Sequence, residues 1–136
     1  MNAMNAERNA ARRSAEDFSF PVDAGARIYT GAIVAMKSTG YATKGATATD
    51  LRGVGIAQAT VDNTGGAAGA VHVEVRRGCY LVKNSAAADQ ITLADVGAVC
   101  YLVDDQTVAK TDGTGTRSPA GIVRDVADSG GVWVEF

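Results

Sequence analysis

The sequence predicts an all-β protein, a small antiparallel barrel or sandwich built from two similar β units with an extended N-terminal arm. Three observations predict this class. Short apolar runs alternate with polar residues and are separated by turn residues about every ten positions, as in barrels and sandwiches. The second half of the chain repeats the first, and no long stretch has apolar residues at helical spacing. A jelly roll and another small barrel both fit this pattern.

The repeat pairs residues 31–75 with residues 97–136 at an offset of 66. The best-matching segments are Gly31-Ala32-Ile33-Val34 with Gly97-Ala98-Val99-Cys100, Gly55-Ile56 with Gly121-Ile122 and, after a gap of five residues, 71–75 with 132–136. In this alignment Trp133 is the counterpart of His72. A repeat of this length indicates that one supersecondary unit is used twice.

The composition is that of a globular chain of one domain's length, with 136 residues, 46% hydrophobic and 6% aromatic. Its formal net charge of −2 argues against a general nucleic-acid binder. Residues 1–88 hold ten Lys/Arg and seven Asp/Glu (+3), whereas residues 89–136 hold three and eight (−5). This asymmetry fits head-to-tail contact between copies, and it also fits scatter on a solvated surface.

Residues 1–17 form a polar, Ala-rich arm that differs in composition from the β domain expected over residues 18–136. The arm has no apolar stripe to bury, so a stable isolated helix is not expected there. It also lacks the apolar run of a secretion signal, and no window of the chain approaches a membrane span. We therefore expect a soluble protein that is made in a reducing cytoplasm and has no membrane contact.

Alternation and turn residues place the strands within the β domain. The expected strands cover residues 18–22, 28–37, 41–44, 54–61, 71–75, 79–83, 99–103, 107–110, 122–126 and 132–136, with a loop or one helical turn at 84–90. Gly53 and Gly55 predict a bend or bulge. In the run 71–75 the valines face a core, while His72 and Glu74 face outward. Cys79 and Cys100 lie in apolar runs, so both thiols are expected in the core.

No residues have the spacing of a catalytic, metal or cofactor site. His72 is the only histidine and has no second ligand at metal spacing around it. Asp104 and Asp105 would face opposite sides of an extended chain, which suits a turn better than shared acid–base chemistry. The Gly-rich run 64–69 lacks the Lys and Ser/Thr of a phosphate loop. We therefore expect no enzymatic activity, no metal and no cofactor.

The run Ala94-Asp95-Val96-Gly97-Ala98-Val99-Cys100-Tyr101-Leu102-Val103 resembles a segment of the short capsid decoration, or cement, proteins of tailed bacteriophages and prophages. The following runs Thr107-Val108-Ala109-Lys110, Gly121-Ile122-Val123 and Gly131-Val132-Trp133-Val134-Glu135-Phe136 continue the similarity. The resemblance covers most of residues 18–136 and consists of pattern and small residues rather than an invariant chemical motif. Residues 1–17 match nothing in that family.

The resemblance implies a structural virion protein made in the bacterial cytoplasm, without enzymatic activity and without direct contact with nucleic acid. It would bind the outer surface of the head as a homo-oligomer, with a trimer favoured over a dimer, and bridge neighbouring major capsid subunits against DNA pressure. The arm residues expected to grip the capsid or a neighbouring subunit are Arg8, Arg12, Arg13, Phe18 and Phe20. The residues expected at oligomer contacts are His72, Arg76 and Trp133.

Two other classes of function remain open. One is a carbohydrate- or ligand-binding β module in which exposed Tyr and Trp side chains stack on sugars. Its aromatic platform would be thin, because the chain has one Trp and four Tyr. The other is a hydrolase, which would need a convergent polar cluster. Retained function after substitution of His72 and of the Asp104-Asp105 pair would dismiss the hydrolase.

Overall fold

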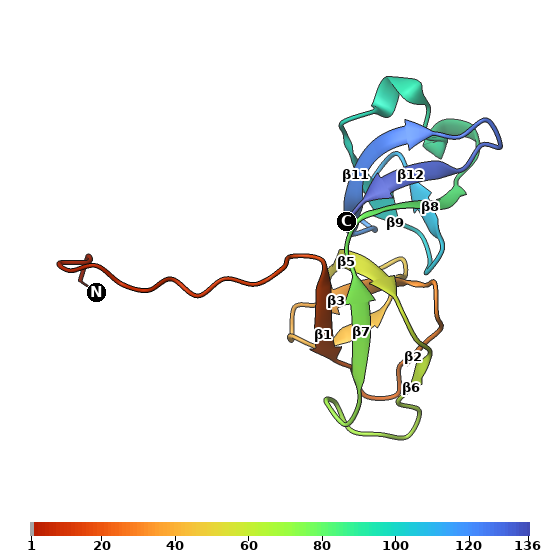
Figure 1. Ribbon diagram of the computed structural model, residues 1–136. Coiled ribbons are helices and arrows are strands. Elements are labelled where there is room, and N and C mark those ends of the chain that lie inside the picture. Colours follow the sequence, from red (N-terminus) through yellow and green to blue (C-terminus); the bar gives the residue numbers. More distant parts are fainter. Residues whose placement is uncertain (1) are drawn as a thin grey trace.

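A computed structural model describes residues 2–136 and confirms the all-β fold. Residues 2–16 contain no helix or strand and extend away from the β body (Figure 1). The strands are β1 Asp17–Pro21, β2 Arg27–Ile28, β3 Ile33–Lys37, β4 Ala42–Lys44, β5 Leu51–Ala57, β6 Val61–Asp62, β7 His72–Arg76, β8 Cys79–Asn84, β9 Val99–Leu102, β10 Thr107–Ala109, β11 Pro119–Val126 and β12 Val132–Glu135. Two single 3-10 turns, η1 Ala87–Asp89 and η2 Leu93–Asp95, are the helical structure of the described residues.

Ten of the strands form two five-stranded sheets. The first sheet has the order β1-β7-β5-β3-β4, and the second closes into a barrel of order β10-β8-β12-β11-β9. Strands β2 and β6 form a separate two-stranded sheet. In Figure 1 the first sheet lies in the lower lobe and the barrel in the upper lobe. We call residues 17–77 unit 1 and residues 79–136 unit 2.

Strand pairing repeats between the units residue by residue. Val34 lies opposite Gly55 in unit 1, and Cys100 lies opposite Gly121 in unit 2, 66 residues later. A register shift follows each of these pairs at the same place. Further equivalent pairs are Ile33–Ile56 with Val99–Ile122, Ala35–Gly53 with Tyr101–Pro119, and Met36–Ala42 with Leu102–Val108. The two units are therefore built alike, and the bulge expected near Gly53 and Gly55 is present.

The last strands of the units align differently from the sequence alignment. Arg76 lies opposite Ile56, and Glu135 lies opposite Ile122, so Arg76 and Glu135 are structurally equivalent. The alignment of residues 71–75 with 132–136 is thus wrong by two residues. Glu74, and not His72, occupies the place of Trp133. Both strands alternate apolar and polar residues, so a slip of two residues leaves the pattern unchanged.

The structural repeat also includes the first strand of each unit. Phe18 of β1 lies opposite Val75 of β7, and Tyr80 of β8 lies opposite Val134 of β12. Strands β1 and β8 therefore hold the same place, 62 residues apart. Each unit consequently contains five equivalent strands.

The units differ where the barrel closes. In unit 2 the backbone N–H of Lys83 donates to the carbonyl of Gln106 at 2.8 Å, and β8 pairs with β10 in parallel. The place of Lys83 in unit 1 is taken by Pro21, which has no N–H to donate. An isolated parallel bridge between Val22 and Ala42 links β1 to β4 there. Unit 1 is therefore an open sheet and unit 2 a closed barrel.

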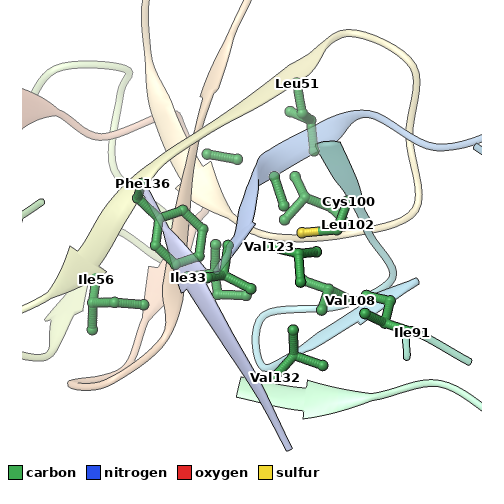
Figure 2. Packing of buried hydrophobic residues seen from close by; sticks show 13 residues of the cluster. Ile33, Leu51, Ile56, Ile91, Cys100, Leu102, Val108, Val123, Val132 and Phe136 are labelled. Atoms are coloured by element: carbon green, nitrogen blue, oxygen red, sulfur yellow. The ribbon is translucent and has the colours of Figure 1, made fainter. Parts of the chain in front are cut away.

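The two units share one hydrophobic cluster of 13 buried residues. Ile33, Leu51 and Ile56 of unit 1 pack in it against interior residues of the unit 2 barrel, and Phe136 closes the chain between them (Figure 2). A second cluster lies within unit 1 and includes Val22, Ile28, Ala32, Val34, Ala42, Ala57, Val73 and Val75. Valine and alanine dominate the second cluster, whereas the shared cluster also contains Ile, Leu, Cys and Phe side chains.

Backbone contacts bring the units close together. The N–H of Ile33 donates to the carbonyl of Asp105 at 2.8 Å, and a Cβ added to Gly53 would clash with the carbonyl oxygen of Ala120. A side chain larger than hydrogen therefore cannot occupy position 53 without moving β5 away from unit 2.

Three further sequence expectations need correction. Residues 28–37 do not form one strand, because Gly31 takes a left-handed φ of 88° in a turn between β2 and β3. Residues 54–61 do not form one strand either, because β5 ends at Ala57 and β6 begins at Val61. Cys79 is exposed, while Cys100 is buried as expected. Cys79 is one of the outward-facing residues of β8, because the even-numbered residues of this strand face the barrel interior. Val73 and Val75 are buried, and His72 and Glu74 are exposed, as the alternation predicts.

Candidate functional site

The arm meets the β body at the start of β1 and the end of β7. The N–H of Arg77 donates to the carbonyl of Glu16 at 2.8 Å, and its guanidinium donates to the carbonyl of Ala15 at 3.4 Å. The guanidinium of Arg76 forms an ion pair with Asp17 at 2.8 Å. Exposed ion pairs contribute little free energy individually. Together these contacts determine the point from which the arm leaves the body.

The structure brings together three of the five arm residues predicted from the sequence. The rings of Phe18 and Phe20 are stacked, with centroids 5.9 Å apart and planes 6° from parallel. The guanidinium carbon of Arg13 lies 4.4 Å from the centroid of the Phe18 ring, within the range of a cation–π interaction. Arg8 and Arg12 lie farther out along the arm and are exposed. Neither forms an ion pair within the described part of the chain.

The residues predicted at oligomer contacts do not form one site. His72 and Arg76 are exposed on the same face of β7, at its opposite ends. Trp133 lies on β12 in the other sheet and is 38% exposed. Its cross-strand neighbour is Leu81, which is also exposed. Arg76 is already held by Asp17. Their role in oligomer contacts stays a prediction.

Sequence reasoning did not identify Arg77 as a functional residue, because a basic pair such as Arg76-Arg77 beside a strand is typical of a solvated strand edge. Its contacts to Ala15 and Glu16 assign it to anchoring the arm. The backbone carbonyls that it contacts are separated from it by about sixty residues of sequence, so no local pattern identifies this contact. The one available signal is position, since Arg77 occupies the place of the buried Phe136 in unit 2.

One end of unit 1 has a hollow of about 600 Å³. Residues from three strands line it, with apolar side chains of Phe20, Met36 and Val54 and polar side chains of Ser38 and Arg52. We call these five residues the mouth of unit 1. A smaller hollow of about 350 Å³ adjoins it and is lined by Phe18, Phe20, Gly53, Val54, Arg77 and Phe136. The stacked aromatic rings of β1 therefore border a concave, partly apolar surface.

A second concave surface, of about 700 Å³, lies on unit 2. Its polar lining includes Lys83, Asn84, Gln90 and Gln106, and it contains no aromatic residue among the described positions. The amide of Asn84 is already satisfied, because it donates to the carbonyl of Ile91 and accepts from the N–H of Ile91. The hollow therefore offers a few amide groups and one ammonium group, without a stacking platform.

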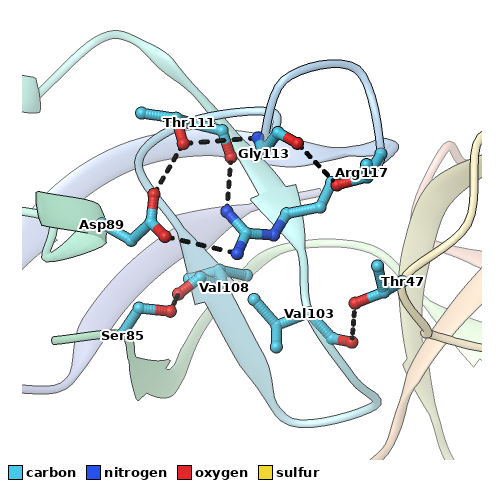
Figure 3. Close-up of polar contacts among 9 residues, drawn as sticks. Thr47, Ser85, Asp89, Val103, Val108, Thr111, Gly113 and Arg117 are labelled. Atoms are coloured by element: carbon cyan, nitrogen blue, oxygen red, sulfur yellow. Dashed lines mark hydrogen bonds and ion pairs between the residues drawn. The ribbon is translucent and has the colours of Figure 1, made fainter.

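A polar network closes the loop between β10 and β11 (Figure 3). The hydroxyl of Thr111 donates to one oxygen of Asp89 at 2.6 Å, and the Arg117 guanidinium lies 3.3 Å from the other. These hydrogen bonds to Thr111 and Arg117 lower the pKa of Asp89. Arg117 also donates to the carbonyl of Thr111. The network joins three segments of unit 2 and leaves no free acid–base pair.

Other carboxylates are used in turns and ion pairs. Asp104 accepts the N–H of Gln106, as expected of a turn. The Arg27 guanidinium, 2.8 Å away, and hydrogen bonds from Thr64 hold the pKa of Asp62 below its ordinary range. These side chains stabilise local structure and do not converge on one point.

Both thiols are free, and burial raises the pKa of each. Burial raises the pKa of Cys100 to about 11, so this thiol is protonated at neutral pH. Within residues 2–136, no three His, Cys, Asp or Glu side chains cluster closely enough to hold a metal ion. The described chain also contains no helix long and apolar enough to span a membrane.

Comparison of the chain with protein families, with curated proteins and with solved structures finds no match.

Proposed function

We propose that this protein is a structural virion protein that binds the exterior of a bacteriophage head and links neighbouring major capsid subunits. The observation that carries the proposal is the exposed arm of residues 2–16, which leaves a stiff β body at a point held by Arg76 and Arg77. The resemblance of residues 94–136 to decoration proteins agrees with it. The proposal assigns no enzymatic activity and no cofactor to the chain.

The arm supplies the chemistry of a docking segment. It exposes Arg8 and Arg12, which form no ion pair within residues 2–136, and it ends at the stack of Arg13, Phe18 and Phe20. A polar segment of this kind orders when it lies on a partner, and the partner's carboxylates would pair with the arginines. Many copies on a lattice then stabilise it by multivalency, although each contact is weak.

The test is co-sedimentation of the purified protein with expanded, undecorated heads. We expect saturable binding at a fixed ratio to major capsid subunits, and that ratio measures the oligomer. A variant that begins at residue 17 should keep its far-UV circular dichroism and lose most of its capsid binding. Full occupancy by this shortened chain would assign binding to the β body instead of the arm.

Two substitutions of Arg13, of which only one keeps the positive charge, separate the effect of charge from that of stacking. Arg13→Lys keeps the positive charge but loses the planar guanidinium over Phe18, so it should weaken binding less than Arg13→Ala. Equal binding by wild type and both variants would remove Arg13 from the docking segment. Absence of binding by the full-length, folded protein would overturn the capsid proposal itself.

The second candidate, a carbohydrate- or ligand-binding module, is favoured by the polar hollow of about 700 Å³ on unit 2. Its size lies within the usual range of small-molecule sites. A glycan screen tests this function, with Gln90→Ala and Gln106→Ala as variants that line the hollow. Binding that both substitutions abolish would support the module.

A further inference from the structure

The contact between the two units inside the chain uses one surface from each unit. Unit 1 contributes the outer face of β3 and β5, where Ile33, Ala35 and Ile56 are almost completely buried against unit 2. Unit 2 contributes the end of its barrel around Leu102 and Ala120, which belong to the same cluster. In this contact, therefore, the outer face of β3 and β5 in unit 1 covers the barrel end of unit 2.

Backbone and side-chain bonds surround this apolar contact. The N–H of Leu51 donates to the hydroxyl of Ser118 at 3.0 Å, and that hydroxyl donates to the carbonyl of Ala48 at 2.6 Å. Thr47 donates to the carbonyl of Val103 at 2.8 Å (Figure 3). The partners on unit 2 are therefore the end of β9, the following turn and the start of β11.

Because the units are built alike, each of these surfaces has a counterpart that the chain leaves uncovered. The counterparts of Ile33, Ala35 and Ile56 are Val99, Tyr101 and Ile122 on the outer face of β9 and β11. Val99 is 42% exposed, whereas Ile33 is fully buried. Tyr101 and Ile122 are half-buried. We call these three residues the β9–β11 face.

The counterpart of the covered barrel end is the mouth of unit 1. Met36 holds the place of Leu102, Arg52 the place of Ser118, and Val54 the place of Ala120. In unit 2 these places are filled by contact with unit 1. In unit 1 they border an open hollow of about 600 Å³. Each chain therefore has one uncovered face and one uncovered barrel end of the kinds that already fit together within it.

The charge distribution favours contact between unlike units. Unit 1 (residues 17–77) holds six Lys/Arg and five Asp/Glu, which gives +1. Residues 79–136 hold four Lys/Arg and eight Asp/Glu, which gives −4, and with the +1 of residues 1–16 the values sum to the net charge of −2. Contact of unit 2 with unit 1 of another copy therefore brings opposite net charges together, whereas contact of unit 2 with unit 2 does not.

We propose that copies of this chain associate head to tail, with the β9–β11 face of one copy covering the mouth of unit 1 of the next. The contact repeats, between chains, the packing of unit 1 on unit 2 within the chain. It is heterologous, so it closes into a ring or continues as a chain of subunits. The inference rests on the repeat and is independent of the capsid proposal.

Analytical ultracentrifugation of the full-length protein over a wide concentration range tests this surface. We expect the wild type to form species heavier than the 13.9 kDa chain. Val99→Asp alters the β9–β11 face at an exposed position, and Arg52→Glu alters the mouth at an exposed position. Each should weaken association about tenfold or more, without loss of the circular dichroism spectrum, because a charge would be buried or repelled at the contact.

Mixing the two variants distinguishes a head-to-tail contact from a symmetric one. The Val99→Asp chain retains an intact mouth, and the Arg52→Glu chain retains an intact face. An equimolar mixture should therefore form a dimer of twice the 13.9 kDa chain mass, although each variant alone is monomeric. A symmetric contact through either surface would not be restored by mixing.

Two controls complete the test. Leu81→Asp adds a charge at an exposed residue beside Trp133, and Lys44→Glu reverses a charge on unit 1 outside the lining of the hollow. Both should associate like the wild type. The proposal is overturned if the wild type stays monomeric, if Val99→Asp and Arg52→Glu associate normally, or if the controls dissociate as strongly as they do.

Discussion

Ile33 and Val99 occupy the same strand position in the two units and have opposite surroundings. Ile33 is fully buried between the units, and Val99 is 42% exposed. Burial, rather than local backbone structure, therefore determines what each side chain contributes to stability. The repeat provides a matched pair of positions with which to measure this difference.

Substitution of this pair by alanine should give unequal losses of stability. Ile33→Ala leaves a cavity at the unit junction and should lower the free energy of unfolding by about 2–5 kcal/mol. Val99→Ala should change it by only about 0.5 kcal/mol, as is usual for exposed positions. Guanidinium unfolding of both variants measures the difference. A loss at Val99 as large as at Ile33 would contradict the assigned burial.

Asp89 links stability to pH through its lowered pKa. A carboxyl whose pKa is lower in the folded than in the unfolded state stabilises the fold above its unfolded pKa of about 4. This contribution is lost as the pH falls through the folded pKa. Asp89→Asn should therefore be less stable than the wild type at pH 7, and the gap should narrow below about pH 4.

Thermal unfolding of the wild type and Asp89→Asn between neutral and acidic pH measures this gap. Thr111→Val serves as the control, because it removes the hydrogen bond that lowers the pKa most and leaves the carboxylate in place. It should lose part of the same pH-dependent stability. A gap that stays constant through the acidic range would assign the Asn effect to packing.

Glycines made the repeat recognisable from the sequence. Gly31 and Gly97 both adopt a left-handed backbone, with φ of 88° and 91°, and both donate to the neighbouring strand. A residue with a side chain is strained there, so the same residue type appears in both units. Most valine positions carry less information, because several β-branched residues can fill one site in a core.

At the scale of elements, one backbone donor contributes to the barrel closure of unit 2, beside the pairing of β8 with β10 at two positions. Lys83→Pro removes the N–H that bonds Gln106 and should destabilise the protein by about 1–3 kcal/mol. Lys83→Ala keeps the donor and should behave like the wild type. Amide hydrogen exchange of β8 and β10 monitors the opening directly. Similar exchange in both variants would show that side-chain packing, not this bond, closes the barrel.

The first and last strands of each unit show where strand prediction fails. Residues 18–22 and 79–83 were each predicted as strands, yet their equivalence was missed, because they share alternation and no glycine landmark. The final strands were matched two residues out of register for the same reason. Alternation gives the face of each residue but not its partner, since partners are chosen by pairing over long sequence separations.

The open sheet of unit 1 is linked to Pro21, which is visible in the sequence. Its effect can be recognised only by comparing unit 1 with unit 2. Pro21 ends β1, an edge strand, where a proline is tolerated. Its structural consequence appears only once Lys83 is known to hold the same place in a closed barrel. The open sheet of unit 1 could not be predicted without this comparison.

At the scale of the whole molecule, the shared cluster predicts that the two units unfold together. The sole tryptophan, Trp133, reports on unit 2, and far-UV circular dichroism reports on both units. The two signals should follow one transition, because unfolding of unit 1 exposes the cluster of unit 2. Two separate transitions would mean that the contact between the units contributes little.

The structure brings together only some of the predicted site residues, because alternation does not identify partners that are distant in the sequence. Composition alone separated the arm from the β body, and the structure places Arg13 against Phe18. The contact of Arg77 with the arm joins segments about sixty residues apart, and no sequence pattern marks it. His72 and Trp133 were grouped through a misaligned strand, and the structure places them on different sheets.

The exposed arm also makes the protein its own reporter of binding. Arg8, Arg12 and Arg13 lie in backbone without regular structure, where trypsin cleaves readily, whereas the strands of the body resist proteolysis. A brief digestion of the free protein should therefore shorten the chain at these arginines and spare the rest. Any partner that holds the arm will slow this cleavage, so the rate of clipping measures occupancy of the arm without a label.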